Sequence, residues 1–294
     1  MGKSMEFQQK WKRKKERLLD VWRCLYRNKA AMTGLVIVVA FVLLAIFAGV
    51  ICDYDMVVNQ DTASRLQAPS SAHWLGTDHL GRDIFARMGY GARVSIGVGF
   101  LVVLISASLG GFIGSFSALL GGRLDNIIMR LVDIFTCIPP MLMTLAMVAA
   151  LGPGLRNLTI ALCINMTVGF IRVVRAAVLS IVNQDFISAA RASGFSTWKI
   201  AIRHVMPNAM GIIIVEGAMS VAGTILSIAG LSFLGLGIQP PSPEWGAMLN
   251  EGRAYMRTFP YMIVFPGIAI ILSALAMNLL GDGLRDALDP RSKR

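Results

Sequence analysis

Six long apolar segments constrain this chain more than any other feature of its sequence. Each is about twenty residues or longer, the length that an α-helix needs to cross roughly 30 Å of membrane hydrocarbon. Only 15% of the 294 residues are charged, whereas a soluble domain has roughly 25%. The sequence therefore predicts an all-α, polytopic membrane protein. The six expected membrane-spanning helices cover residues 31–51, 94–119, 126–151, 158–179, 209–236 and 261–280.

The distribution of charge predicts which side of the membrane each segment faces. The net charge is +11, and residues 1–30 are strongly basic. A basic chain can bind nucleic acid, but this charge lies in a terminal run and in short loops between apolar segments, which indicates a membrane protein instead. Cytoplasmic loops are enriched in Lys and Arg, whereas the polar stretch 52–91 is rich in Asp. We expect a basic cytoplasmic segment at 1–30, a transmembrane domain at 31–294, and both chain ends in the cytoplasm.

Prolines and glycines predict where the spans bend and where they pack closely. Pro139 and Pro140 interrupt the third expected span, so a kink or break is expected there. Gly110 and Gly114 form a Gly-x-x-x-Gly pair in the second span. Such a pair lets two membrane helices approach closely, although glycine is also simply tolerated in long helices.

The segment 185–208 is the longest informative stretch with polar residues between two apolar blocks. Asp185 is placed to cap a short helix, and Gly194 is placed to end it. Ser196 or Thr197 can cap a second short helix, which Pro207 is expected to break. These features predict a helix–turn–helix at the membrane surface; the plain alternative is an ordinary loop between helices. A flank of small residues suits insertion into a groove of a partner: Ala189, Ala190 and Ala192.

A second motif lies in the expected outer loop, at residues 73–83, His-Trp-Leu-Gly-Thr-Asp-His-Leu-Gly-Arg-Asp. Gly76 and Gly81 are expected to turn this loop around Thr77. Ion pairs among Asp78, Arg82 and Asp83 are expected to hold it. Its two histidines are six residues apart, which is not a usual spacing for metal ligands, so no metal site is predicted.

Motifs for catalysis are absent from the sequence. An ATPase needs a Gly-x-x-x-x-Gly-Lys-[Ser/Thr] loop to hold phosphates, and Gly2-Lys3-Ser4 has no glycine upstream. No paired catalytic carboxylates and no nucleophile motif occur. The chain is therefore expected not to be an enzyme and to bind no cofactor itself. If it pumps a solute, a partner must hydrolyse ATP and grip this chain.

Few polar residues inside the expected spans could serve transport. Glu216 and Asp133 are the two carboxylates placed there, and a carboxylate in a membrane usually faces a cavity or a partner group. The alternative for both is a structural ion pair, for example with Arg172 or Arg175. Further candidates for the pathway are Asn165, Ser220 and Thr224.

Several motifs together resemble one family. Ala189-Ala190, followed by Gly194 and by Pro207, resembles the coupling segment of ABC importer permeases. Ser188 stands where that family usually has Glu, and His204 is common in its peptide and nickel branch. The loop motif at 75–83, the following Tyr-Gly-Ala-Arg-Val-Ser, and the run Gly-Leu-Ser-Phe-Leu-Gly-Leu-Gly at 230–237 closely match that branch. The chain is similar to the permease subunits of dipeptide, oligopeptide and nickel ABC importers.

This resemblance implies a type I permease fold in a bacterial or archaeal cytoplasmic membrane. The implied partners are a homologous permease in a heterodimer, two cytoplasmic ATPases that hold ATP and Mg²⁺, and an external substrate-binding protein. The residues implied to contact the ATPase are Ser188, Ala189, Ala190, Arg191, Gly194, His204 and Pro207. The cargo is expected to be a peptide, with nickel or another small solute as the alternative. A self-sufficient channel or secondary transporter would usually show internal repeats, and no convincing repeat is present.

Overall fold

The computed structural model describes residues 16 and 19–288 and consists of helices joined by loops, with no β-strand in that part of the chain. The basic run at 12–15 and the tail at 289–294 lie outside the described residues. In chain order the helices are α2 (Lys29–Ile51), α3 (Asp55–Val58), η1 (Thr62–Ser64), α4 (Ile84–Leu120), α5 (Gly122–Thr136), α6 (Pro140–Leu151), α7 (Leu155–Val182), α8 (Asp185–Ala192), α9 (Thr197–Ile200), η2 (Ala201–Val205), α10 (Met206–Phe233), α11 (Trp245–Gly252), η3 (Arg253–Tyr255) and α12 (Tyr261–Leu288).

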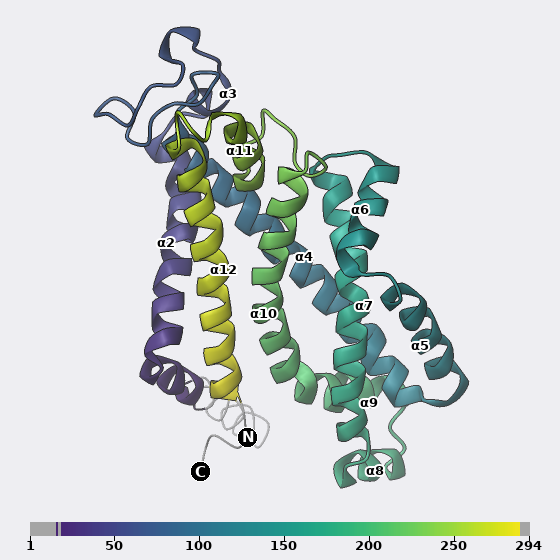
Figure 1. The fold of residues 1–294 in the computed structure, drawn as a ribbon. Coiled ribbons are helices and arrows are strands. Elements are labelled where there is room, and N and C mark those ends of the chain that lie inside the picture. The colour runs from purple at the N-terminus through teal and green to yellow at the C-terminus, as the bar shows by residue number, and fades with distance from the viewer. Residues whose placement is uncertain (1–15, 17–18, 289–294) are drawn as a thin grey trace.

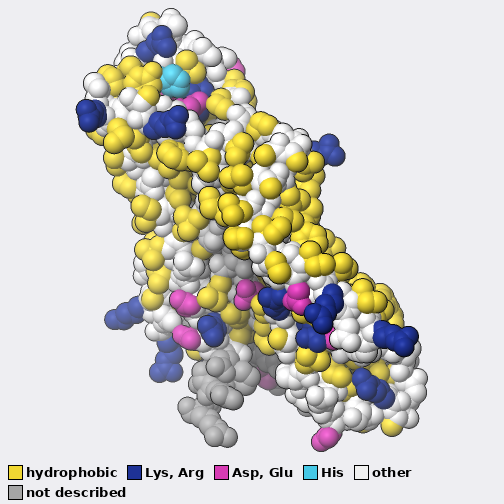
Figure 2. Space-filling view, turned by 45° about the vertical axis from the view of Figure 1, so that its right-hand side comes forward, with side chains coloured by type: hydrophobic (Ala, Val, Ile, Leu, Met, Phe, Trp, Pro, Cys, Tyr) yellow, Lys and Arg dark blue, Asp and Glu magenta, His cyan; other side chains and the backbone are white. Residues whose placement is uncertain are grey.

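Among the described residues, five helical segments are long and apolar enough to cross a membrane, and a bent pair can form a sixth. The pair is α5 and α6, which meet at an angle of 83°. The break falls at Pro139 and Pro140, as the sequence predicts, because a proline cannot continue a helix from the preceding turn. Figure 2 shows hydrophobic side chains over the middle of one face, with charged side chains gathered toward its two ends.

The second span begins ten residues earlier than expected, so the prediction of a loop up to residue 91 is wrong. Asp83 caps the N-terminus of α4, and its carboxylate accepts a hydrogen bond from the backbone N–H of Ala86 at 2.9 Å. Arg87 and Tyr90 are consequently helical and buried. Hydropathy did not reveal these first turns because they carry polar side chains that are buried by the loop and by α11.

The long helix α4 runs diagonally through the bundle and connects its two sides (Figure 1). Its Gly-x-x-x-Gly pair faces α7, which confirms the expected close approach. A side chain on Gly114 would come within 2.6 Å of the backbone oxygen of Ile171, and Gly110 lies equally tightly against Phe170. α2 and α12 lie side by side on the other edge of the bundle, with α10 between α12 and α7 (Figure 1).

The two ends of the bundle differ in character. The loop at 52–83 and α11 lie at one end, whereas the start of α2, the end of α12 and the short helices α8 and α9 lie at the other (Figure 1). At the loop end, Trp245 is fully buried and its indole N–H donates to the backbone oxygen of Met88 at 3.1 Å. Glu244 caps α11 by accepting from the N–H of Ala247 at 2.8 Å. Complete burial raises the pKa of the Glu244 carboxyl, in opposition to the hydrogen bonds that it accepts.

Candidate functional site

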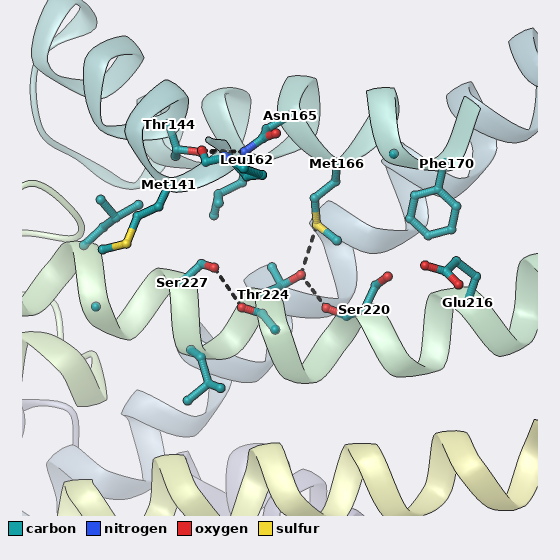
Figure 3. Close-up of a pocket in the computed structure, with 16 residues that line it drawn as sticks. Met141, Thr144, Leu162, Asn165, Met166, Phe170, Glu216, Ser220, Thr224 and Ser227 are labelled. Carbon is teal, nitrogen blue, oxygen red and sulfur yellow. Dashed lines mark hydrogen bonds between the residues drawn. The ribbon is translucent and has the colours of Figure 1, made fainter. Parts of the chain in front are cut away.

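A cavity of about 720 Å³ opens between α6, α7 and α10. The break between α5 and α6 places α6 on one side of it, because the two halves of the third span point in different directions. Figure 3 shows α7 and α10 lying across the cavity from one another, with Met166 and Phe170 pointing toward α10 and Asn165 toward Thr144 of α6. The lining residues are Pro140, Met141, Thr144, Leu162, Asn165, Met166, Gly169, Phe170, Glu216, Ser220, Gly223, Thr224, Leu226, Ser227, Gly230 and Leu231.

The polar residues of α10 form one stripe along the cavity. Glu216, Ser220 and Thr224 are spaced by four residues, so they lie on the same face of the helix. Ser227 continues that face and lies about three turns after Glu216. Small residues between them, such as Gly223, keep the surface open. The structure therefore brings together four of the five residues that the sequence suggested for a pathway, namely Glu216, Ser220, Thr224 and Asn165.

Most polar groups of this cavity already have partners within the chain. The hydroxyl of Thr224 lies 3.1 Å from the sulfur of Met166 and donates to the backbone oxygen of Ser220 at 2.8 Å (Figure 3). The side-chain amide of Asn165 donates to the backbone oxygen of Pro140 at 2.7 Å and to the hydroxyl of Thr144 at 3.0 Å. Asn165 thus ties α7 to the first turn of α6, next to the proline break.

Glu216 differs from these groups. It is half-buried, and in the described part of the chain no hydrogen bond or ion pair engages its carboxylate. It also lines a second cavity of about 540 Å³ toward the α8 end of the bundle, together with Asn208, Met219 and Arg285. Glu216 therefore borders both cavities.

Asp133 does not line this cavity. Its carboxylate accepts a hydrogen bond from Arg172 at 2.9 Å, and Arg172 also donates to the hydroxyl of Thr136. Both members of the ion pair are about half exposed. This is the structural pair that the sequence left open as the alternative for Asp133.

The helix–turn–helix at 185–208 is present, with one capping residue misassigned. Asp185 is the first residue of α8 and does not cap it; Gln184 holds the capping position without a side-chain hydrogen bond. Gly194 follows the helix end with φ +75°, the left-handed conformation expected for it. Ser196 caps the second helix by accepting from the N–H of Lys199 at 3.4 Å.

Pro207 does not break the second helix, contrary to expectation. The five-residue π-helix η2 joins α9 to α10, so the helical backbone continues from Thr197 to Phe233. Pro207 is the second residue of α10, directly after this π-helix. Within η2, His204 is partly buried and stacks on Phe195, with ring centroids 6.0 Å apart.

The alanine flank of α8 is divided between the interior and the surface. Ala190 and Ile187 are buried in a hydrophobic cluster with Val174 and Val178 of α7. Ala190 therefore packs inside its own chain, and its contact with an ATPase stays a prediction. Ala189 and Ala192 are exposed, as are the polar residues Ser188 and Arg191.

The outer-loop motif forms a buried ion network. Asp78 accepts from Arg82 at 2.7 Å and from Arg87, while Glu251 accepts from Arg82 at 3.0 Å and from Arg87 at 2.7 Å. Burial alone would raise the pKa of Asp78, but the two guanidinium groups hold it below its usual value. The sequence did not indicate Arg87 and Glu251 as members of this network, because Glu251 lies 169 positions after Arg82 in the chain.

Gly76, Gly81 and Thr77 shape this loop as expected, whereas Asp83 does not join the expected ion pairs. Gly76 and Gly81 have φ of +80° and +81°, and a side chain on Gly81 would overlap the backbone of Asp61. Thr77 is fully buried and its hydroxyl oxygen accepts from the N–H of Gln67 at 2.8 Å. Asp83 pairs with His73, at 2.8 Å, instead of joining the arginines.

One group of potential metal ligands occurs among the described residues: Asp78, His79 and Glu251. Both carboxylates of this group are already neutralised by Arg82 and Arg87. A cation placed there would have to displace two buried guanidinium groups, so the group serves the loop's structure.

Spanning helices with a mixed polar and apolar cavity between them, and a surface helix–turn–helix at one end, define a multi-pass membrane permease. Comparison with known proteins gives its family. Residues 110–294 match the binding-protein-dependent transport system inner membrane component, and residues 17–69 match the N-terminal transmembrane domain of oligopeptide transport permease C. The chain belongs to this family of ABC importer permeases, which are multi-pass inner-membrane proteins and not enzymes in their own right.

Named relatives cover nearly the whole chain. A dipeptide transport system permease protein of Alkalihalophilus pseudofirmus is 42% identical over 93% of this chain and 90% of its own length. A glutathione transport system permease protein of Escherichia coli O157:H7 is 44% identical over the same shares of the two chains. A solved chain of the MetNI methionine ABC transporter has a TM-score of 0.51 at 18% identity and covers 66% of this chain and 94% of its own, which supports the type I permease fold. Membership implies a partner permease, an ATPase and a substrate-binding protein in general terms.

Proposed function

We propose that this chain is one half of the translocation pathway of a peptide importer. It pairs with a homologous permease as a heterodimer, receives cargo from an external substrate-binding protein, and is driven by two cytoplasmic ATPases that hold ATP and Mg²⁺. The named relatives support a peptide cargo, because a dipeptide and glutathione are both small peptides. The N- and C-termini are cytoplasmic in this proposal.

The observation that carries the proposal is the chemistry of the cavity between α6, α7 and α10. Its volume of about 720 Å³ lies in the range of organic ligand pockets. Hydroxyl and amide groups alternate with Met and Phe side chains, a mixture that suits a peptide backbone with varied side chains. Glu216 is the one carboxylate among the lining residues, and none of them is His or Cys. Nickel is usually bound by several imidazole or thiolate ligands, so this lining favours a peptide over a metal ion.

The coupling segment 185–208 connects the proposed ATPase contact to the two helices that line the cavity, α7 and α10. Ser188, Ala189 and Arg191 lie on the exposed side of α8 and are proposed to contact an ATPase. The buried side of α8 packs on α7, and the helical continuation through η2 leads directly into α10. A displacement of α8 would therefore reach both helices that line the cavity. Gly194, His204 and Pro207 set the geometry of this connection.

Reconstitution in vesicles tests this function. The complete complex, with both permeases, both ATPases and the binding protein, is expected to accumulate a labelled dipeptide only with internal ATP. Nickel offered in the same vesicles should not be accumulated. Peptide uptake without ATP would instead support a channel or secondary transporter, and ATP-driven nickel uptake would support the metal importer.

A further inference from the structure

We propose that Glu216 and Ser220 bind the amino-terminal ammonium group of the peptide in transit. This inference rests on the proposed passage of peptides through the cavity between α6, α7 and α10. It assigns one end of the cargo to one place in the cavity and so fixes the direction in which the peptide lies.

The position of Glu216 is the first observation. Its side chain lines both the 720 Å³ cavity and the 540 Å³ cavity toward the α8 end. In Figure 3 its carboxylate points from α10 toward α7, close to Phe170. A solute that moves from one cavity to the other therefore passes this carboxylate.

The second observation is that two neighbouring polar groups lack partners. In the described part of the chain neither the Glu216 carboxylate nor the Ser220 hydroxyl makes a side-chain hydrogen bond, whereas Thr224 and Asn165 are engaged. Glu216 and Ser220 are one helical turn apart on the same face. A half-buried carboxylate in a membrane protein is costly to keep without a partner, so a ligand that supplies donors would find two acceptors in place.

The chemistry of the lining selects an ammonium group. Glu216 is the one charged residue that lines the larger cavity, so a cationic group there is attracted to it, whereas Arg285 shares only the smaller cavity with Glu216. An ammonium group carries three N–H donors, enough for both oxygens of the carboxylate and for the Ser220 hydroxyl. A divalent cation would require several further hard or imidazole ligands, and the remaining lining offers hydroxyls, an amide and thioethers.

Disulfide trapping tests the orientation of the peptide directly. In the full complex, Cys24, Cys52, Cys137 and Cys163 are replaced by Ser, and Gly169→Cys places one thiol on α7 in the same cavity. Gly169 is exposed with no atom within 4 Å of a side chain added there, so this change is tolerated. The probes are Cys-Ala-Ala, Ala-Ala-Cys and N-acetyl-Cys-Ala-Ala, each activated as a thiopyridyl disulfide, and trapping is quantified by mass spectrometry.

The measured quantity is the trapping rate of Cys-Ala-Ala divided by that of Ala-Ala-Cys. It is compared with the same ratio in Glu216→Gln, because an amino-terminal cysteine exchanges at its own rate in any site. We expect the ratio to fall about tenfold in Glu216→Gln, the effect of one charged hydrogen bond. Glu216→Asp should restore part of it. N-acetyl-Cys-Ala-Ala should trap equally in both backgrounds, since it lacks the ammonium group.

A matched control removes a charge outside both cavities. Asp282→Asn, on the exposed face of α12, should leave the ratio unchanged. The ammonium site would be overturned if the trapping ratio were the same in the protein with Glu216 and in Glu216→Gln. It would also be overturned if Glu216→Gln slowed the trapping of N-acetyl-Cys-Ala-Ala by the same factor as that of Cys-Ala-Ala. ATP-driven uptake by the unaltered complex is measured in parallel: its absence would refute peptide transport, whereas normal uptake with unchanged trapping ratios would refute the ammonium site alone.

Discussion

Arg175 of α7 donates two hydrogen bonds, each 2.6 Å long, to the two carboxylate oxygens of Asp125 in α5. Ser117 of α4 donates to the same carboxylate. Three helices therefore meet at one acidic side chain near the end of the bundle that carries α8. This junction holds the first half of the broken span against α7, whose Val174 and Val178 also pack on the coupling segment.

Arg175→Ala is expected to lower the free energy of unfolding by about 2 kcal/mol, less than the full cost of unpairing a buried charge because Arg175 is 25% exposed. Arg172→Ala provides the matched control, since its pair with Asp133 is about half exposed and exposed pairs contribute less than about 1 kcal/mol. Denaturant titration of the purified protein measures both. Equal losses would show that the Asp125 junction is no more important than a surface pair.

The contact of α4 with α7 makes a second prediction. Gly114→Ala forces a β-carbon toward the backbone oxygen of Ile171, so the free energy of unfolding should fall by about 1–3 kcal/mol. Gly97→Ala in the same helix meets no atom within 4 Å and should be neutral or stabilising, because alanine favours a helix by about 1 kcal/mol. A neutral Gly114→Ala would mean that the two helices do not approach as described.

The outer ion network predicts a dependence on pH. Because the pKa of Asp78 is lowered in the folded protein, its stabilising effect is complete above the ordinary Asp pKa of about 3.9 and is lost as the pH falls through the lower folded value. Asp78→Asn should cost about 3–5 kcal/mol near pH 7, since it leaves two buried arginines with Glu251 alone. The difference between the two proteins should be constant down to about pH 5 and shrink below about pH 4.

Thermal unfolding of the wild-type protein and of Asp78→Asn, followed from pH 3 to pH 7, measures this difference. A gap that persists unchanged at about pH 3 would contradict the assignment of the titrating group to Asp78.

Features that depend on neighbouring residues were readable from the sequence. Apolar length predicted the spans, Pro139 and Pro140 predicted the break, and Gly194 and Ser196 predicted the turn of the coupling segment. Each of these follows from local backbone chemistry, which does not require knowledge of what lies nearby.

Features that depend on tertiary packing were not readable. Ala190 looks the same in sequence as Ala189, yet one is buried against α7 and the other is exposed. Glu251 gave no signal as a partner of Arg82, because only the fold brings them together. Gln184, the residue before Asp185, occupies the N-cap position of α8. Residue propensities do not locate a helix end to within one residue.

The proposed orientation in the membrane has its own test. A reporter fused after Arg294 and another placed within residues 1–20 should both report the cytoplasm, because basic segments stay inside. A reporter inserted near Ala68, in the loop at the opposite end of the bundle, should report the outside. A cytoplasmic signal at Ala68 would contradict the six-span topology, because α2 would then not cross the membrane.

Cross-linking from α8 in the assembled complex tests the central claim, that a partner ATPase drives this permease through residues 185–208. In a background without native cysteines, a single cysteine replaces either Ala189, which is exposed, or Ala190, which is buried. Ala189→Cys is expected to form a cross-link to an ATPase subunit whose rate changes when ATP is added, while Ala190→Cys should not react. An assembled, ATP-hydrolysing complex in which Ala189→Cys fails to cross-link, or in which both positions react equally, would contradict the account.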